Sequence, residues 1–230
     1  MMISVIIPTL NESSTIARTL TRTVALGFDD IIVSDGGSSD STRQMVQTCC
    51  ARVPAVRLVT APTGRARQLN EGVKACRGDV LLFLHADTEL PPTARTAIES
   101  ALEHDSYVGG RFDVRFDQPS RWGAVISWFM DRRSRLTGIA TGDQAIFVRR
   151  RVFEQMGGFP DIPLMEDIEF SRRLKRRGPT AALTDRVTTS FRRWEKNGPL
   201  RTILLMWTLR FLYWLGVSPA RLNNFYRAIR

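Results

Sequence analysis

The sequence predicts an α/β protein with a mostly parallel, doubly wound sheet, flanking helices and a C-terminal amphipathic helical appendage. Over the first ninety residues, short apolar runs typical of buried strands alternate with segments of helical pattern, which predicts parallel strands joined by helices. The chain has 230 residues, of which 43% are hydrophobic, and this is enough for one core with additions. No internal repeat or low-complexity linker divides it.

The first strand is expected at Ile3–Pro8, a continuous apolar run of the kind that is buried on both faces of a sheet. Ser13 or Ser14 can cap the following helix, which is expected to reach about Ala25. The alternation continues with strand Asp30–Ser34, a helix capped by Asp40 and running to about Cys50, strand Val56–Thr60, helix Gly64–Cys76, strand Val80–Leu84 and a helix that opens at Pro91 and Pro92.

The middle of the chain is less regular. Its predicted elements are strands Tyr107–Phe116 and Gln144–Val148 and helices Trp122–Leu136 and Glu166–Arg177. A Gly-Gly-Phe-Pro turn at 157–160 leads into a loop before the last of these helices, and Gly178 and Pro179 end that helix. We expect these elements to complete one compact domain.

The appendage contains a densely apolar and aromatic segment at 199–215, PLRTILLMWTLRFLYWL. Arg201, Thr208 and Arg210 interrupt it, so the uninterrupted run is shorter than the ~20 apolar residues that a membrane-spanning helix needs. Two alternatives fit the pattern, namely a helix lying at a membrane interface and a helix packed on the protein's own core.

The positive charge of the chain lies entirely in its last third. Residues 1–148 carry 16 basic and 16 acidic side chains, whereas residues 149–230 carry 17 basic against 7 acidic ones, which accounts for the whole net charge of +10. This polarity indicates an anionic partner, which could be nucleic acid, a membrane lipid or a phosphorylated substrate, although a merely soluble basic surface is the alternative.

The cysteines and the N-terminus bear on where the protein works. Cys49, Cys50 and Cys76 are odd in number and two are adjacent, which favours neither a disulfide framework nor a zinc site, and a reducing cytosol fits best. The N-terminal segment lacks a basic region and a small-residue cleavage site, so its apolar run is expected to be a strand and not a signal peptide. We therefore expect a cytoplasmic protein, peripheral at most on the cytoplasmic face of the inner membrane.

Three polar clusters follow predicted strands, at the carboxyl ends where open α/β sheets bind ligands. The clusters are Pro8-Thr9-Leu10-Asn11-Glu12, Asp35-Gly36-Gly37-Ser38-Ser39-Asp40 and His85-Ala86-Asp87-Thr88. The carboxylates of Glu12 and Asp35 can accept hydrogen bonds from ribose or a base, and Asp87 is a hard oxygen ligand suited to Mg²⁺ or Mn²⁺ near a diphosphate. His85 is either a second ligand or, as we favour, a residue at the strand end that only hydrogen-bonds backbone.

Three other classes of protein that bind nucleotides or nucleic acids would need motifs that the sequence does not show. A nucleotidyltransferase that makes nucleotide sugars is the main alternative, but it would need a glycine- and lysine-bearing phosphate loop, and residues 8–20 contain neither residue. A basic nucleic-acid-binding protein would need a recognisable binding motif, and none is evident, so we expect no nucleic-acid partner. A nicotinamide enzyme would need GxGxxG after the first strand.

The chain resembles the inverting family 2 glycosyltransferases, which have the GT-A fold. The motifs that carry the resemblance occur in order over about residues 1–180, and they are SVIIPTLNE, IIVSDGGSSDST, VLLFLHADT, GDQAIFVRRRVFEQMGGFP and MEDIEFSRRLKRRG. The resemblance implies that a sugar is transferred from a nucleotide diphosphate sugar to an acceptor hydroxyl, with inversion at the anomeric carbon and the help of Mn²⁺ or Mg²⁺. It names neither the sugar nor the acceptor.

The resemblance also implies roles for individual residues. Asp167 matches the catalytic base, and Glu166 beside it is expected to help bind the acceptor. Asp87 matches the last acid of the DXD metal motif, whose first acid is His85 here. The residues expected to contact the nucleotide sugar are Pro8, Thr9, Asn11, Glu12, Asp35, Gly36, Arg65, Asn70, Ala86, Asp87, Arg192 and Arg193.

Some of these roles have open alternatives. Arg65 either faces phosphate or is solvated, and Glu166 and Asp167 could be ordinary first-turn helix charges. The segment Ser190–Trp194 is similar to the QxxRW motif of processive members, with Ser in place of Gln, so its arginines either clamp the diphosphate or form an exposed basic turn.

We expect a GT-A domain at 1–195, made of a nucleotide-binding half at 1–90 and an acceptor-binding half at 91–195, and an appendage at 196–230.

Overall fold

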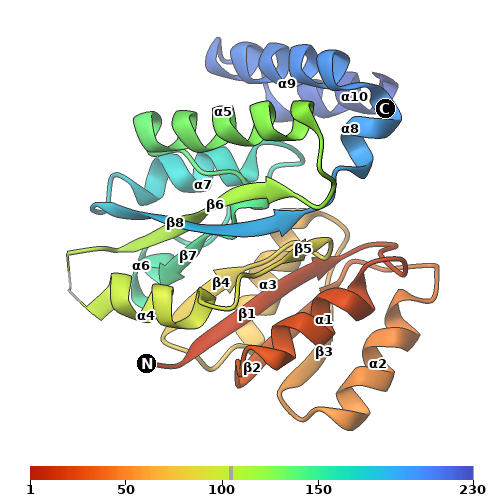
Figure 1. Cartoon of the computed structure of the whole chain (residues 1–230), viewed down its shortest axis with the longest axis vertical. Coiled ribbons are helices and arrows are strands. Elements are labelled where there is room, and N and C mark those ends of the chain that lie inside the picture. Colours follow the sequence, from red (N-terminus) through yellow and green to blue (C-terminus); the bar gives the residue numbers. More distant parts are fainter. Residues whose placement is uncertain (104–105, 230) are drawn as a thin grey trace.

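The computed structural model describes residues 1–103 and 106–229, and Figure 1 shows their arrangement. The described strands form one eight-stranded sheet in the order β3-β2-β1-β4-β7-β6-β8-β5. Its first half is parallel throughout and consists of β1 (Ile3–Thr9), β2 (Asp30–Asp35), β3 (Val56–Thr60) and β4 (Val80–Phe83). The predicted α/β class and the four N-terminal strands are therefore confirmed.

The second half of the sheet mixes strand directions. Antiparallel pairs join β7 (Phe147–Arg149) to β4, β6 (Gly109–Phe116) to β7, and β5 (Thr88–Glu89) to β8 (Thr180–Thr189), while β6 and β8 run parallel. Two glycines open β6 where strands approach closely. A Cβ atom on Gly109 would lie 2.4 Å from the Phe147 carbonyl oxygen, so a larger residue would push β6 away from β7.

Helices cover both faces of the sheet (Figure 1). They are α1 (Ile16–Ala25), α2 (Thr42–Arg52), α3 (Arg65–Ala75), α4 (Ala94–Glu103), α5 (Arg121–Thr137), the 3₁₀ turn η1 (Gly142–Gln144), α6 (Arg150–Gln155), α7 (Glu166–Leu174), α8 (Arg192–Asn197), α9 (Pro199–Trp214) and α10 (Pro219–Ile229). Alternate residues of β1 point to opposite faces, so Val5 and Ile7 pack with α1, α2 and α4, whereas Ile6 packs with α3, α6 and α7. This is the packing of a doubly wound sheet.

Several predicted boundaries are wrong. The first helix begins at Ile16 after Thr15, without a side-chain cap from either Ser13 or Ser14. Asp40 lies one residue before the Ser41 cap position of α2, although its carboxylate does accept a hydrogen bond from the Thr42 backbone N–H at 3.0 Å. The helix expected from Pro91 begins at Ala94.

The later elements differ more from the predictions. Gln144 ends a 3₁₀ turn instead of starting a strand, and its side-chain amide donates to the Phe112 carbonyl. Helix α7 ends at Leu174, short of the predicted Arg177. The prediction lacks β8, whose sequence TAALTDRVTT is half polar because only one of its faces is buried. It also lacks β5, α6, α8 and the separate helix α10.

The appendage packs on the rest of the protein. Leu209 of α9 and Leu222 of α10 form a small buried cluster with Met165, the residue before α7, and Leu164 and Ile168 pack against it. Of the two alternatives for segment 199–215, core packing therefore describes one face of α9. Among the described helices, none is both long and apolar enough to cross a membrane.

Candidate active site

Asp35 ends β2 and organises the loop that follows. Its carboxylate is fully buried and accepts hydrogen bonds from the backbone N–H groups of Gly37 and Ser38, each at 3.1 Å, and from the Ser38 hydroxyl. Arg43 of α2 lies 3.1 Å away as its ion-pair partner. Burial by itself would raise the pKa of Asp35, but the hydrogen bonds from Ser38, Gly37 and Arg43 outweigh it and lower that pKa, so the carboxylate is charged at neutral pH.

The loops after β1 and β2 are tied together. Asn11, which has a positive φ of 56°, accepts a hydrogen bond from the Ser39 backbone through its side-chain oxygen at 2.8 Å, and its own N–H donates to the Ser38 hydroxyl. Below them, the buried Gln68 amide donates to the carbonyl oxygens of Thr9 and Ser34. A Cβ atom on Gly36 would lie 2.8 Å from the Gln68 side chain, so only glycine fits there. Two predicted clusters thus form one surface, and Gln68 and Arg43, which the sequence analysis missed, support it.

The other predicted residues at the carboxyl ends of β1 and β4 are mostly buried. The Thr9 hydroxyl is buried and lies 3.4 Å from Asp35 as a donor, while Pro8 is half-buried. Ala86 is buried, and its carbonyl accepts a hydrogen bond from Thr19 of α1 at 2.7 Å. These residues shape the backbone at the ends of β1 and β4.

Glu12 and Asp87 bring two negative charges together at the ends of β1 and β4. Both side chains are half-buried. Burial raises the pKa of Glu12, and the neighbouring charge of Asp87 raises it further, while Arg192 and His85 act in the opposite direction. A cation between the two carboxylates would relieve their repulsion. The described residues contain no group of three or more His, Cys, Asp or Glu side chains arranged as a complete metal cage.

His85 pairs with an acid that the sequence analysis did not single out. Its Nδ1 lies 3.1 Å from Asp143 Oδ1 in η1. The favoured prediction, a histidine that only hydrogen-bonds backbone, is wrong, because this partner is a carboxylate. A Cβ atom on Gly142 would lie only 2.3 Å from His85 Nε2, so glycine at 142 is required for the imidazole to lie against this turn.

Asp167 is held at the first turn of α7 by two backbone groups. Its Oδ2 accepts a hydrogen bond from the Gly142 N–H at 2.9 Å, and its Oδ1 accepts one from the Ile168 N–H at 2.8 Å. Gly142 is also the residue that packs on His85, so η1 connects the end of β4 to α7. The residue before the two acids, Met165, has a φ of 70°, an uncommon backbone conformation for a residue with a side chain. Such strain is found where the surroundings fix the backbone.

Glu166 points away from Asp167, as neighbouring helical residues do, and pairs with Arg65 of α3. The distance between Arg65 Nη1 and Glu166 Oε1 is 3.2 Å, and the glutamate is almost fully buried. Burial raises the pKa of Glu166, Arg65 opposes the rise and Asp167 adds to it. Arg65 is half exposed, and the carboxylates of Glu166 and Asp167 raise its own pKa against the effect of burial. Arg65 is thus an exposed residue at the start of α3, as the solvated alternative expects, but it also pairs with Glu166. Contact with a donor phosphate stays a prediction for Arg65.

Asn70 supports the loop before α7. Its amide donates to the Phe159 carbonyl and accepts from the Phe159 N–H, both at 2.9 Å. Because both ends of the amide are engaged, Asn70 positions the turn at Gly158, whose Cβ would meet the amide oxygen at 2.6 Å. Arg67 pairs with Asp161 in the same loop at 2.8 Å. That Asn70 contacts the nucleotide sugar stays a prediction.

The segment Ser190–Trp194, which is similar to the QxxRW motif, leads into helix α8. Arg192 is 59% exposed, lies 3.7 Å from Glu12 and donates to the Ser14 hydroxyl at 3.1 Å, so it crosses to the loop after β1. The side chain of Arg193 lies outside the described part of the structure. Trp194 packs against Phe116 and Phe191, with ring centroids 6.0 and 6.5 Å away. Arg192 is exposed, as the alternative of an exposed basic turn expects, but the segment begins a helix instead of forming a turn. Binding of the diphosphate stays a prediction for both arginines.

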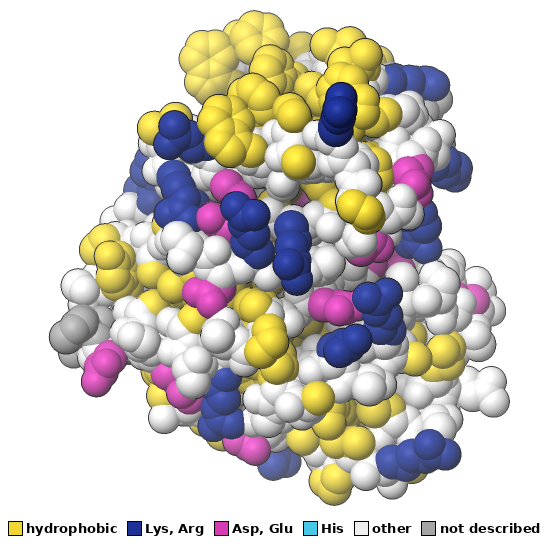
Figure 2. Space-filling view, viewed as in Figure 1, with side chains coloured by type: hydrophobic (Ala, Val, Ile, Leu, Met, Phe, Trp, Pro, Cys, Tyr) yellow, Lys and Arg dark blue, Asp and Glu magenta, His cyan; other side chains and the backbone are white. Residues whose placement is uncertain are grey.

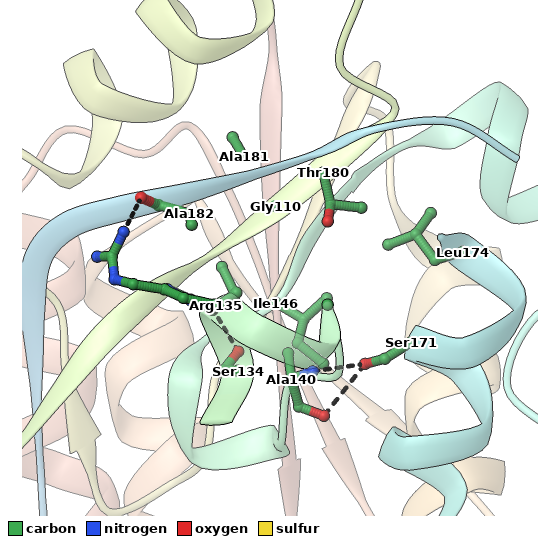
Figure 3. Close-up of a pocket in the computed structure, with 12 residues that line it drawn as sticks. Gly110, Ser134, Arg135, Ala140, Ile146, Ser171, Leu174, Thr180, Ala181 and Ala182 are labelled. Atoms are coloured by element: carbon green, nitrogen blue, oxygen red, sulfur yellow. Dashed lines mark hydrogen bonds between the residues drawn. The ribbon is translucent and has the colours of Figure 1, made fainter. Parts of the chain in front are cut away.

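Arg133 of α5 is a further charged residue of this region that the sequence analysis missed. Burial lowers its pKa to about 10, and the charge of Arg210 in α9 contributes, while Asp167 and Asp143 oppose the shift. No local signal marks it, because it is one of several arginines in a helical segment. A separate pocket lies between α5, α7 and the β6–β8 edge and includes Ser134, Arg135 and Ser171 (Figure 3). None of the predicted donor-site residues lines it.

Carboxylates and arginines thus converge at the carboxyl ends of β1, β2 and β4 and at the start of α7. The sequence model of glycosyl transferase family 2 matches residues 4–157. The chain belongs to glycosyl transferase family 2. It is 30% identical over 158 residues to the undecaprenyl-phosphate 4-deoxy-4-formamido-L-arabinose transferase of Pseudomonas fluorescens, a match that covers 64% of this chain and 46% of that protein.

Other relatives are similar at the same level. Glycosyltransferase AglJ of Haloferax volcanii is 29% identical over 134 residues, which are 56% of this chain and 43% of that protein. The chain spans about half the length of the curated relatives it matches.

Solved structures of similar proteins show the fold. The mannosyltransferase PcManGT of Pyrobaculum calidifontis, solved with GDP-Man and Mn²⁺, superimposes with a TM-score of 0.62 at 23% identity, covering 82% of this chain and 56% of that one. Residues 1–349 of S. aureus TarS in complex with UDP-GlcNAc give a TM-score of 0.64 at 17% identity, covering 83% and 58%. The predicted GT-A fold is confirmed.

Proposed function

We propose that the protein transfers a sugar from a nucleotide diphosphate sugar to an acceptor hydroxyl, with inversion at the anomeric carbon. The observation that carries the proposal is the placement of Asp167, which two backbone N–H groups hold next to the turn that packs on His85. His85 in turn interacts electrostatically with both Glu12 and Glu166, so the donor-side and acceptor-side acids belong to one site. Family members solved with GDP-Man and UDP-GlcNAc support a nucleotide sugar donor.

The chemistry of such a transfer is a single displacement. The acceptor oxygen forms a bond to the anomeric carbon as the bond from that carbon to the diphosphate oxygen breaks on the opposite face. The acceptor proton passes to the Asp167 carboxylate, Glu166 helps to bind the acceptor, and Arg65, its ion-pair partner, is suited to a donor phosphate. Arg192, and Arg193 next to it, are suited to binding the departing diphosphate, because a guanidinium matches phosphate geometry.

The residues present fit a divalent metal. Mg²⁺ and Mn²⁺ in such sites are commonly held by one or two carboxylates together with substrate phosphates and water, so a complete protein cage is unnecessary. The neighbouring charges of Asp87 and Glu12 provide such a place, and we propose Asp87 as the ligand. When bound, the metal would supply neutralisation of charge on the leaving diphosphate. The Mn²⁺ in the PcManGT structure supports this proposal.

The general test is a screen of nucleotide sugars for binding and slow hydrolysis in the presence of Mn²⁺ or Mg²⁺. We expect at least one nucleotide sugar to bind and to be hydrolysed slowly with the metal present. The absence of both with every common nucleotide sugar would contradict the proposal.

Asp35→Ala is expected to weaken nucleoside diphosphate binding about tenfold or more. The Asp35 side chain anchors the loop at Gly37 and Ser38, and the loss of its charge-assisted hydrogen bonds costs about 1.5–3 kcal/mol. If nucleotide binding must restore the loop, this cost is taken from the binding free energy, and each 1.4 kcal/mol is about a tenfold loss of affinity. Calorimetry with a nucleoside diphosphate and Mn²⁺ measures the change in affinity. Asp29→Ala is the matched control, because Asp29 is an exposed acid just before β2 and should bind as the wild type does. Unchanged affinity in Asp35→Ala would remove it from the site.

We also propose that the protein docks on an anionic membrane surface through α9 and α5. On α9, one stripe of side chains at helical spacing faces solvent, and on α5 a second stripe does the same. The exposed members are Leu200, Leu204, Trp207, Phe211 and Trp214 on α9 and Trp122, Val125, Trp128, Phe129 and Leu136 on α5. Figure 2 shows hydrophobic side chains gathered at the end of the molecule where α9 lies, with basic side chains beside them.

Several facts favour a bilayer as the partner of this apolar face. Tryptophan and phenylalanine next to arginine are the composition of interfacial helices, and the exposed Arg121 and Arg201 lie on the same two helices. Several curated relatives, among them that of Pseudomonas fluorescens, are named as undecaprenyl-phosphate sugar transferases, and undecaprenyl phosphate is a lipid phosphate. A lipid phosphate oxygen is therefore a second candidate for the attacking group.

The membrane proposal predicts that the protein co-sediments with vesicles rich in phosphatidylglycerol and much less with phosphatidylcholine vesicles. Each basic side chain near an anionic surface contributes ~1 kcal/mol, and salt screens the attraction. Trp128→Glu and Trp207→Glu should each reduce binding several-fold. Tyr107→Glu is the matched control, because Tyr107 is an exposed aromatic residue outside α5 and α9. Equal binding to both vesicle types, or no loss at high salt, would contradict the electrostatic part.

A further inference from the structure

The guanidinium of Arg133 has unsatisfied hydrogen-bonding groups. Its Nε and Nη2 atoms are buried, and neither has a hydrogen-bond partner among the described residues. A buried donor that is left unpaired is costly, and a charged one more so, which means that native structures rarely keep such a group without a reason. Arg133 as a whole is only partly buried, so the group lies close beneath the surface.

The surroundings of Arg133 contain a second cation and the catalytic end of α7. Arg210 of α9 lies close enough to lower the proton affinity of Arg133, and the carboxylates of Asp167 and Asp143 lie close enough to raise it. The group therefore stays charged at neutral pH while it faces a like charge. An anion placed against Arg133 and Arg210 would supply acceptors to the free N–H groups and remove the repulsion between the two cations.

The position of this pair relative to the rest of the molecule indicates which anion it would receive. Arg133 belongs to α5 and Arg210 to α9, the two helices whose outer stripes are apolar and exposed. The same guanidinium is within electrostatic range of Asp167. The charges that act most strongly on Arg133 are those of Arg210, Asp167 and Asp143, whereas those that act most strongly on the donor-side Glu12 are Asp87, Arg192 and His85.

We propose that Arg133, with Arg210 beside it, forms a subsite for the phosphate group of a lipid acceptor, held between the membrane-facing helices and the catalytic carboxylate. This inference rests on the proposed sugar transfer, and it takes up the second candidate for the attacking group, a lipid phosphate oxygen, in place of a hydroxyl. A planar guanidinium with two unused N–H directions is suited to a phosphate oxygen pair. The subsite gives Arg133 a role in acceptor binding and none in donor binding.

The experiment measures binding of farnesyl phosphate, a soluble phosphorylated isoprenoid, to the full chain by calorimetry. Wild-type protein should bind farnesyl phosphate at least about tenfold more tightly than farnesol, and Arg133→Met should lose that preference. Arg132→Met is the matched control, because Arg132 is the exposed neighbour on α5 and lies over the Trp128 ring at 5.5 Å. It should behave as the wild type within about twofold.

Two further measurements make the result specific. The melting temperature of Arg133→Met should equal or exceed that of the wild type, because methionine removes a buried unpaired charge, whereas a purely structural arginine would give a lower one. Inorganic phosphate in place of farnesyl phosphate separates a free anion from a lipid phosphate. Equal affinity for the two would overturn the lipid assignment, and farnesyl phosphate affinity that is absent in the wild type or unchanged in Arg133→Met would overturn the subsite.

The same samples separate this inference from the proposed function. Nucleoside diphosphate affinity with Mn²⁺ should be equal in the wild type and Arg133→Met. If nucleotides fail to bind any variant while farnesyl phosphate binding depends on Arg133, the proposed sugar transfer fails and the phosphate subsite stands. If nucleotides bind normally and Arg133→Met leaves farnesyl phosphate binding unchanged, the subsite fails alone.

Discussion

Asp167→Asn is expected to lower the rate of sugar transfer about 10²–10⁴-fold, the usual effect of removing a positioned general base. Asparagine cannot accept the acceptor proton. It also carries an NH₂ group where the carboxylate now faces the N–H groups of Gly142 and Ile168, so one of these donors loses its acceptor. The measurement is the steady-state rate with saturating donor and Mn²⁺, together with the anomeric configuration of the product.

The controls for this variant follow from the same contacts. Nucleotide affinity should stay within about twofold of the wild type, and a lower melting temperature is expected because an unmet buried donor costs about 1–3 kcal/mol. Glu166→Gln should be less damaged in rate, since the glutamine can still accept a hydrogen bond from Arg65. A rate within a few-fold of the wild type in Asp167→Asn, or a product that retains the donor configuration, would rule out the proposed mechanism.

The identity of the attacking group changes the size of this effect. A hydroxyl must lose its proton during the transfer, whereas a phosphate monoester, with a second pKa of about 6, is already largely ionised at neutral pH. A loss near 10⁴-fold in Asp167→Asn would therefore favour a hydroxyl. With a lipid phosphate acceptor, the rate of Asp167→Asn could instead fall less than tenfold while the product still has the inverted anomeric configuration. That result would assign attack to the phosphate oxygen and leave Asp167 with a positioning role.

Removal of the divalent metal is expected to abolish transfer. Charge neutralisation of a leaving diphosphate contributes several kcal/mol to the transition state, so EDTA should lower the rate at least about 10³-fold, and Mn²⁺ or Mg²⁺ should restore it. Asp87→Ala should reproduce the loss even in excess metal. Titration of activity with each metal, in the wild type and the variant, measures both effects.

The two ends of β4 supply the control for the metal prediction. Asp79 precedes this strand and Asp87 follows it, and both are acids on exposed or half-exposed turns. Asp79→Ala should therefore keep full, metal-dependent activity. Full turnover of the wild type in chelator, or a wild-type rate in Asp87→Ala, would show that the carboxylate pair formed with Glu12 serves another purpose.

The parts of the fold and site that were predictable from sequence are the ones set by local pattern. Strands β1, β2 and β4 are runs buried on both faces, and the residues that follow them meet because parallel strands end at the same edge. Glu12, Asp35 and Asp87 could therefore be placed at one edge of the sheet. The early position of Asp167 in α7 was predictable from the loop before it.

The parts that were not predictable depend on contacts between distant residues. Strand β8 has a mixed polar sequence, and it is a strand because β6 and β5 pair with it on either side. His85 finds Asp143 across 58 positions, and Arg65 finds Glu166 across 101. Arg133 stands out only when its lack of hydrogen-bond partners among the described residues is known.

The packing of the appendage affects how its function can be separated from catalysis. Leu209 and Leu222 cover Met165, whose left-handed backbone directly precedes the two acids, and the Tyr213 hydroxyl donates to Glu169 of α7 at 3.2 Å. A chain cut at residue 195 would lose the exposed apolar stripe of α9 and would also uncover Met165 at the start of α7. Inactivity of such a fragment would therefore say nothing about membrane attachment. Only substitutions on the outer stripe, such as Trp207→Glu, can separate attachment to a bilayer from the shape of the active site.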